Sequence, residues 1–499
     1  MRLSTLVLLA ALAPAAGAQN TPAAGAQNTP GAAAKPITLA DAIAMGQQRG
    51  DQAEQARASR DVARYRNDAF NARLRPQLFL SGNAANLNHG INSITAPDGS
   101  TAFVGQSQNQ SSMLLGFSQA IPLTGGTITV GSAVSRIDEF GTSYNKAWST
   151  SPVVLSLQQD LFKPRDIVWN ERIQSLGASV AERSYLEARE DVAGNIADAF
   201  FNLYTQQMTM ANAMANVAVN DTLYTLNKGR YEVGKIGEND LLKSELALLR
   251  ARASVDDANL ARDRAEAALR RMLNYPAEQA LTIVPPDSIP TIEADADLAI
   301  KEALKNASLV EQSQLDEVVV KREITQARLN NGFSASIQAT VGFNQTASGL
   351  GAAYQSPLGR QSFTLGVAMP MVQWGAGRSD VQAAKADDRR VAANNKTRRD
   401  QIAEDARFSV LQLQQAQRNV VLAAKADTVS IKQFEVARNR YTTGKISNTD
   451  LYNAQSDKDN SLIAHIQALR SYWNAYYHLR RATLYDFATK QELSDERGR

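Results

Sequence analysis

Two stretches of this sequence, 210 residues apart, carry the same motif. The motif reads Arg-Tyr-x-x-Gly-Lys-Ile-x-x-x-Asp-Leu and occupies residues 230–241 and 440–451. Each copy interrupts a region rich in helix-forming residues. A glycine followed within a few residues by polar capping side chains ends one helix and begins the next. The chain is therefore predicted to contain two repeats, each with a helical hairpin whose tip is the motif.

Both repeats alternate between charge-free and charge-rich segments. Asp, Glu, Lys and Arg are absent from residues 76–97, 99–135, 331–359 and 361–377. Charged residues, alanine and leucine are concentrated, with few glycines and prolines, at about 37–75, 166–274, 293–330 and 378–485. These charge-rich segments are predicted to be long helices. One of them, about 378–438, would be roughly 90 Å long, which no ordinary globular domain needs.

The charge-free segments have a period of two, as β-strands do. Ala335, Ile337, Ala339, Val341 and Phe343 alternate with small or polar residues. Similar runs predict six strands, at about 77–88, 112–121, 127–136, 152–162, 334–344 and 361–371. Their length of about nine to twelve residues suits tilted strands that cross a bilayer. A half-buried sheet of a soluble domain explains the period equally well.

The predicted connections favour the membrane. Those at about 89–111, 137–151 and 347–360 are long and polar, whereas Pro122–Gly126 is a tight turn. Outer-membrane barrels combine long external loops with short periplasmic turns. The six predicted strands therefore fit a membrane sheet better than a soluble one.

The N-terminus predicts export. Residues 1–18 have the charge, apolar core and small-residue site of a signal peptide, followed by a flexible Pro/Ala-rich leader at 19–36. Ala-Gly-Ala occurs at both 16–18 and 24–26, so the cleavage site stays open. No cysteine is present to carry a lipid anchor, and no later run of about 18 apolar residues predicts a spanning helix. Periplasm, outer membrane and medium remain as destinations.

Composition argues against an enzyme. The chain has no cysteine, three dispersed histidines and a formal charge of +3. Thiolate catalysis, zinc fingers and histidine-clustered metal sites are thereby excluded or disfavoured, and charge gives no sign of nucleic-acid binding. Phosphate-binding glycine loops and metalloprotease motifs are also absent from the sequence. We expect no enzymatic activity, no cofactor and no metal.

The paired tip motifs, the signal peptide and the alternating segments together resemble the TolC family of outer-membrane efflux proteins. The resemblance covers residues 37–485. It implies a membrane α+β fold, in which a homotrimer forms one outer-membrane β-barrel that continues into a long periplasmic α-helical barrel. The implied layout is a first repeat at 37–275, a connector at 276–292, a second repeat at 293–485 and a C-terminal tail at 486–499.

Family membership would make the protein a passive, gated channel for efflux or type I secretion. It implies a periplasmic membrane-fusion adaptor, an inner-membrane efflux pump or ABC exporter, and outer-membrane lipid as partners. The sequence names neither cargo nor pump. The alternative from another class is a secreted trimeric coiled-coil fibre or adhesin, although a fibre has no use for two matching hairpins.

The sequence departs from the family in its number of strands. Family members usually contribute four strands per protomer, whereas six are predicted here. The extra pair is 112–121 with 127–136. If it spans the membrane, a trimer has eighteen strands rather than twelve and a wider lumen. If it is an extracellular hairpin, the family count is kept. Strand length and the tight intervening turn favour spanning.

By resemblance, the tips contact the adaptor and an adjacent constriction forms the gate. The tip residues are Gly234, Lys235, Ile236, Gly444, Lys445 and Ile446. Asp240 and Tyr441 match the positions of a polar latch, and Asp450 matches a ring of acids. The glycines would end helices in any case, and both aspartates suit helix capping, so these simpler roles stand beside the functional ones.

Overall fold

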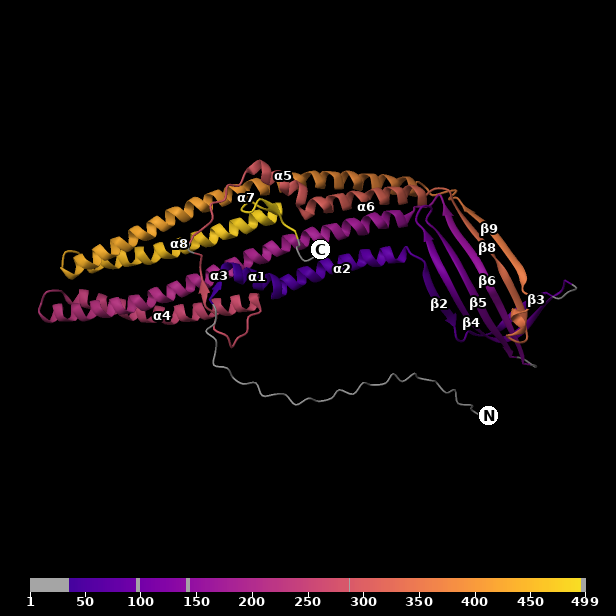
Figure 1. The fold of residues 1–499 in the computed structure, drawn as a ribbon, viewed down its shortest axis with the longest axis horizontal. Coiled ribbons are helices and arrows are strands. Elements are labelled where there is room, and N and C mark those ends of the chain that lie inside the picture. The colour runs from indigo at the N-terminus through magenta and orange to yellow at the C-terminus, as the bar shows by residue number, and fades with distance from the viewer. Residues whose placement is uncertain (1–35, 96–98, 141–143, 287, 495–499) are drawn as a thin grey trace, which may run out of the picture.

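The computed structural model describes residues 36–95, 99–140, 144–286 and 288–494. Long helices make up most of the molecule, with a curved sheet at one end and two helical hairpins at the other (Figure 1). The predicted signal peptide, and all of the predicted leader except its last residue, lie outside the described residues.

The first half contains four helices: α1 (Leu39–Arg49), α2 (Asp51–Arg73), α3 (Asp166–Glu232) and α4 (Glu238–Leu273). One extended residue, Gly50, separates α1 from α2, so the helix predicted over 37–75 is in fact two. A Cβ at Gly50 would lie 2.5 Å from the Gly46 carbonyl oxygen. The junction therefore requires glycine.

The second half repeats these helices: α5 (Ala296–Asn306), α6 (Ser308–Asn330), α7 (Ala376–Thr442) and α8 (Asn448–Thr483). The first two match α1 and α2 in length at an offset of 257 residues, and the last two match α3 and α4 at an offset of 210. The offsets differ by 47 residues, 257 minus 210, so the first half has 47 extra residues between α2 and α3. The predicted duplication is confirmed.

Seven strands form one antiparallel sheet: β2 (Gln77–Asn83), β3 (Leu87–Thr95), β4 (Thr101–Ile121), β5 (Gly126–Phe140), β6 (Asn145–Leu161), β8 (Ser334–Ala347) and β9 (Leu358–Ala368). The order is β2-β4-β5-β6-β8-β9, and β3 pairs with the part of β4 that β2 leaves free. Pairing of β6 with β8 joins the two halves.

The loop predictions around these strands were wrong. Strand β3 and the first half of β4 occupy most of the predicted loop 89–111. Strands β5 and β6 leave only residues 141–144 of the predicted loop 137–151 as a connection, and β9 takes the last residues of the predicted loop 347–360. Polar composition suggested loops, but strand pairing uses backbone groups that every residue carries, so polar residues extend strands where a partner is present.

The extra strand pair, β4 with β5, lies inside the sheet between β2 and β6. Gly116 of β4 is opposite Gly131 of β5, which is opposite Val154 of β6, and Val154 is opposite Gly342 of β8. The pair is therefore level with its neighbours. This position agrees with spanning rather than with a separate external hairpin.

One face of the sheet is apolar and uncovered. Phe117, Val130, Leu155 and Val341 form a row across four strands and are 42 to 55% exposed. A soluble domain would bury such a row, whereas a lipid-facing surface presents it. The uncovered face supports a membrane sheet.

The main apolar core lies midway along the long helices. Phe200 and Phe201 of α3 and Tyr472 of α8 are fully buried there. Short parallel strands β1 (Ile37–Thr38) and β7 (Ile283–Val284) tie the start of the first repeat to the connector. The predicted tail is in part folded, because β10 (Tyr485–Asp486) and β11 (Gln491–Glu492) form a hairpin.

Within the described residues, no helix has the length and apolar character needed to cross a membrane.

Candidate functional site

The two motif copies form matching turns, one between α3 and α4 and one between α7 and α8. Gly234 and Gly444 have φ angles of 72° and 73°. A Cβ added at either would meet nothing within 4 Å, so the left-handed backbone, not crowding, requires glycine. Each following lysine closes the turn by donating its backbone N–H to the arginine carbonyl: Lys235 to Arg230 at 2.8 Å and Lys445 to Arg440 at 2.9 Å.

The predicted adaptor-contacting residues lie at the free ends of the hairpins, far from the sheet (Figure 1). Lys235 and Lys445 are exposed, whereas Ile236 and Ile446 are half-buried. Two lysines and two glycines thus form a small, accessible and positively charged end. Adaptor contact at this end stays a prediction.

Tyr441 connects the two hairpins within one chain. It belongs to a second apolar cluster, the tip cluster, formed by Leu223, Phe434, Tyr441, Leu451 and Ala454. Its side chain is 3% exposed, and its hydroxyl donates to Asn227 Oδ1 on α3 at 2.8 Å. Asn227 Nδ2 in turn donates to Asn448 Oδ1 on α8 at 3.5 Å. A buried polar link therefore crosses from the first hairpin to the second.

Asp240 lies apart from this link. It is half-buried in the first turn of α4, and within the described part of the chain its carboxylate makes no hydrogen bond or ion pair. Its capping role is not observed either, because the N-cap of α4 is Gly237, which has no side-chain oxygen. The Tyr441 hydroxyl binds Asn227 instead. The Asp240–Tyr441 latch is therefore not formed in a single chain, and it stays a prediction.

Asp450 caps α8. Its carboxylate accepts hydrogen bonds from the Ser447 hydroxyl at 2.8 Å and the Ser447 N–H at 3.1 Å, and the Ser447 hydroxyl accepts the Asp450 N–H. The Ser447 hydroxyl, and then its N–H, hold the pKa of Asp450 below its usual value. Asp450 is exposed and charged, so it can also form part of an acidic ring.

Asn227 and Asn448 were not predicted from the sequence. The only signal is a difference between repeats: Asn227 corresponds to Ala437, and Asn448 corresponds to Glu238. Tyr452, next to the tip cluster, was also missed. Burial raises the pKa of Tyr452 to about 12, and its hydroxyl has no hydrogen-bond partner among the described residues. The tip region thus stores polar groups that a second conformation could satisfy.

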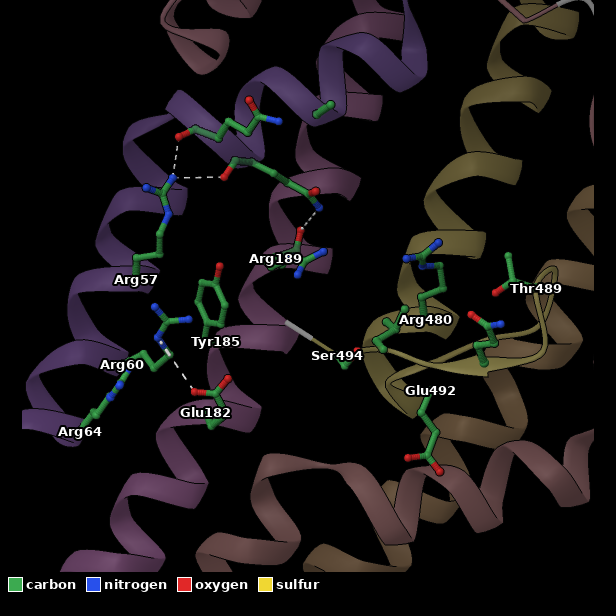
Figure 2. A pocket seen from close by; sticks show the side chains of 15 residues that line it. Arg57, Arg60, Arg64, Glu182, Tyr185, Arg189, Arg480, Thr489, Glu492 and Ser494 are labelled. Atoms are coloured by element: carbon green, nitrogen blue, oxygen red, sulfur yellow. Dashed lines mark hydrogen bonds and ion pairs between the residues drawn. The ribbon is translucent and has the colours of Figure 1, made fainter. Parts of the chain in front are cut away.

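A cleft of about 750 Å³ opens midway along the molecule, between α1, α2, α3 and the C-terminal hairpin (Figure 2). Five arginines line it: Arg57, Arg60, Arg64, Arg189 and Arg480. Several are already engaged, since Arg57 binds Glu54 and Arg60 binds Asp61 and stacks on Tyr185. Their charge is therefore largely balanced by carboxylates.

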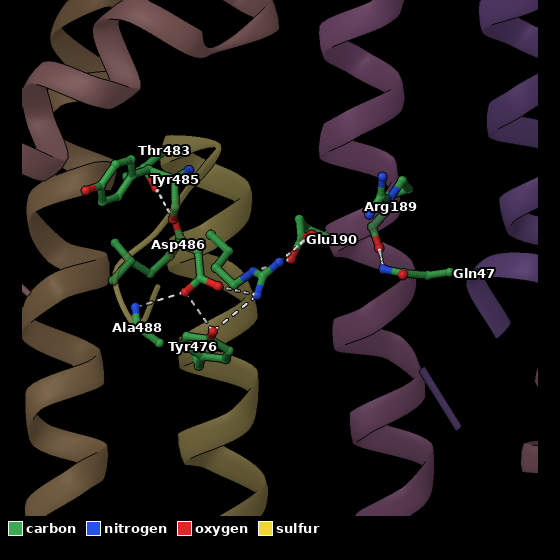
Figure 3. Close-up of polar contacts among 10 residues, drawn as sticks. Gln47, Arg189, Glu190, Tyr476, Thr483, Tyr485, Asp486 and Ala488 are labelled. Atoms are coloured by element: carbon green, nitrogen blue, oxygen red, sulfur yellow. Dashed lines mark hydrogen bonds and ion pairs between the residues drawn. The ribbon is translucent and has the colours of Figure 1, made fainter. Parts of the chain in front are cut away.

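Arg480 is the centre of a buried ionic network that joins α3, α8 and the C-terminal hairpin (Figure 3). Its Nε donates to Glu190 Oε2 at 2.8 Å and its Nη1 to Asp486 Oδ2 at 3.1 Å. The Tyr476 hydroxyl donates to Asp486 Oδ1 at 2.9 Å. Burial raises the pKa of Glu190 against the opposing effect of Arg480. For Asp486, burial acts upward but the charge of Arg480 prevails and lowers the pKa.

The described residues contain no group of three or more His, Cys, Asp or Glu side chains arranged to hold a metal ion.

Known proteins were compared with the chain once this geometry was established. A family model described as "Outer membrane efflux protein" matches residues 123–275 and 299–483, one segment in each repeat. No curated protein matches the chain.

Solved structures share the fold. The CmeC outer membrane channel of Campylobacter jejuni has 16% identity and a TM-score of 0.65, over 92% of this chain and 87% of that one. The outer membrane protein VceC of Vibrio cholerae has 14% identity and a TM-score of 0.64, over 90% and 96%. The open state of the Neisseria gonorrhoeae MtrE outer membrane channel has 16% identity and a TM-score of 0.61, over 89% and 88%.

Proposed function

Because the chain belongs to the outer membrane efflux protein family, the TolC family, we propose that it is the outer-membrane component of a tripartite efflux or type I secretion system. The chain is an outer-membrane efflux channel that extends into the periplasm, and not an enzyme. The proposal adds two partners: a periplasmic membrane-fusion adaptor, and an inner-membrane efflux pump or ABC exporter that supplies the energy. Family membership leaves no support for the fibre alternative.

The placement of the tips relative to the sheet carries this proposal. The uncovered apolar face suits outer-membrane lipid, and α3 and α7, with 67 residues each, extend roughly 100 Å at 1.5 Å per residue. The hairpin tips lie at the far end of these helices (Figure 1). A partner in the periplasm can reach them there without entering the outer membrane.

TolC-like channels form trimers, and we propose a trimer for this chain. Strands β2 and β9 are the two ends of the sheet, and each has an edge without a partner in the chain. Unpaired edges are not tolerated in lipid, so β9 of one chain would pair with β2 of the next. With six spanning strands per chain, the barrel would have eighteen strands and a wider lumen than the family's twelve.

A tip variant tests the proposed partners separately from the channel. Lys235→Glu with Lys445→Glu should abolish export in cells that carry the variant in place of the native chain, because the charge at the adaptor-facing end is reversed. Conductance in planar bilayers should stay unchanged, since the lysines are exposed and outside the tip cluster. The charge-matched control is Lys432→Glu, on exposed α7 surface above the tip. Normal export by the double variant would exclude the tips as the partner contact.

We propose that Asp450 also contributes to an acidic ring at the constriction. Asp450→Asn removes the charge but keeps an oxygen that can accept from Ser447, so the cap survives in part. The cation selectivity of the reconstituted channel, measured as the reversal potential in a KCl gradient, should fall. Asp457→Asn, one carboxylate further along α8, serves as the control. Unchanged selectivity would leave Asp450 with capping as its only role.

A further inference from the structure

The helices of the two halves correspond residue by residue. Helices α3 and α7 have 67 residues each, and α4 and α8 have 36 each. Both correspondences have the 210-residue offset of the tip motif. A contact between α3 and α8 within the chain therefore has an equivalent pair of positions on α7 and α4, which are not in contact with each other in one chain.

The contact between α3 and α8 is polar along much of its length. Three pairs of side chains cross it: Asp198 with Arg470 at 2.6 Å, Asn216 with Asp459 at 2.7 Å, and Asn227 with Asn448 at 3.5 Å. These pairs hold the two hairpins of one chain side by side.

At the equivalent positions, α4 carries an exposed apolar stripe. Leu249 and Leu260 take the places of Asp459 and Arg470 and are 55% and 52% exposed. Leu242 and Leu246 continue the stripe at helical spacing toward the tip. An apolar stripe of this kind on a helix is stable only when another surface covers it.

Helix α7 carries the matching stripe. Phe408 stands where α3 has Asp198, and Val429 and Val436 stand where α3 has the half-buried residues Val219 and Leu226. Each of the three α7 residues is 56% exposed. Both helices are therefore apolar and uncovered on the faces that their repeat equivalents use to join.

Charge is also complementary across the two faces. The ion pair Glu190–Arg480 translates by 210 residues to Asp400 on α7 and Arg270 on α4. The signs of the charges are kept although the residues differ. A second copy of this chain, placed by the internal repeat, would thus meet matching charge as well as matching apolar surface.

We propose that α7 of one chain packs against α4 of a second copy in the register that α3 and α8 have within the chain. This proposal rests on the trimer proposed above and gives its contact a register and a chemistry. The seam between chains is apolar, whereas the seam within each chain is polar. Hydrophobic contact keeps the chains together, and the polar seams are the ones that can part when the tips move.

Disulfide trapping tests the register, and the chain has no cysteine of its own to interfere. Ala426 and Leu249 are the equivalents of Asn216 and Asp459, whose short side chains meet. Ala426→Cys with Leu249→Cys should give a covalent, reductant-sensitive trimer after oxidation of the purified protein in detergent. Asn216→Cys with Asp459→Cys should cross-link within a single chain and give no covalent oligomer.

The register control is Ala426→Cys with Leu242→Cys. Leu242 is on the same stripe but seven residues away, about 10 Å along the helix, which is beyond the reach of a disulfide. A trimer by native mass spectrometry that fails to cross-link at 426 and 249, or that cross-links better at 426 and 242, overturns the seam and leaves the channel proposal intact. A protein that is only monomeric overturns both.

Discussion

Replacing Arg480 by methionine is expected to destabilise the folded chain by about 3–5 kcal/mol, because two buried carboxylates would lose their cation. The side chains of Glu190 and Asp486 are 3% and 10% exposed, so water cannot take its place. Both carboxylates hydrogen-bond to the Arg480 guanidinium. The measurement is the free energy of unfolding followed by helical circular dichroism in detergent, at one fixed protein concentration.

The deficit of the Arg480→Met variant should shrink as the pH falls from about 8 to about 5. Burial already raises the pKa of Glu190, and loss of Arg480 removes the charge that opposes this rise. A carboxyl whose folded pKa exceeds its unfolded value favours folding below the unfolded value and loses that contribution as pH rises through the folded pKa. The parent chain behaves oppositely at Asp486, whose lowered pKa gives stability that is lost on acidification.

Arg481→Met is the matched control. Arg481 is the next residue along α8 and pairs with Asp191, but the two side chains are 42% and 51% exposed. An exposed pair of this kind contributes about 0–1 kcal/mol, so a small loss is expected. Equal losses in the two variants, or an Arg480→Met deficit that does not change with pH, would contradict the buried network.

Local signals in the sequence predicted the elements that depend on local chemistry. Gly234 and Gly444 marked both tips because a left-handed turn requires glycine, and both have positive φ. The long helices followed from composition, and the core of each strand followed from the period of two. Strand ends did not, because β3 is held by its pairing with β4, which no local pattern encodes.

The site was less predictable because its contacts join residues far apart in the chain. Tyr441 was identified through the family, but its partner Asn227 is 214 residues away and lies in an unremarkable helical segment. Arg480 and Glu190 are 290 residues apart. Each is an ordinary charged residue on a helix until folding places it inside the molecule. Sequence patterns report the face of an element, whereas partners depend on how elements pack.

Removing the Tyr441 hydroxyl is expected to open the periplasmic end. Tyr441→Phe leaves Asn227 Oδ1 without its donor in a buried site, which costs about 1–3 kcal/mol in the joined state. Water can satisfy Asn227 once the hairpins separate, so the cost applies to the closed state only. A differential of this size shifts a closed–open equilibrium by about 5- to 150-fold. Single-channel recording in planar bilayers should show a correspondingly higher open probability.

Tyr231→Phe is the internal control, because Tyr231 is the equivalent of Tyr441 in the first repeat. Its side chain is 41% exposed and lies outside the tip cluster, so its loss should leave gating unchanged. Asn227→Ala should act like Tyr441→Phe, since it removes the same bond from the other side. If Tyr231→Phe and Tyr441→Phe act alike, the Asn227 bond is not the gate.

Asp240→Ala then separates two explanations of the gate. If a latch to Asp240 forms between chains, combining Asp240→Ala with Tyr441→Phe should raise the open probability beyond either single change. If the bond to Asn227 is the whole latch, Asp240→Ala adds nothing, because its carboxylate makes no contact in the described part of one chain. The comparison therefore assigns gating either to a polar seam within the chain or to a link between chains.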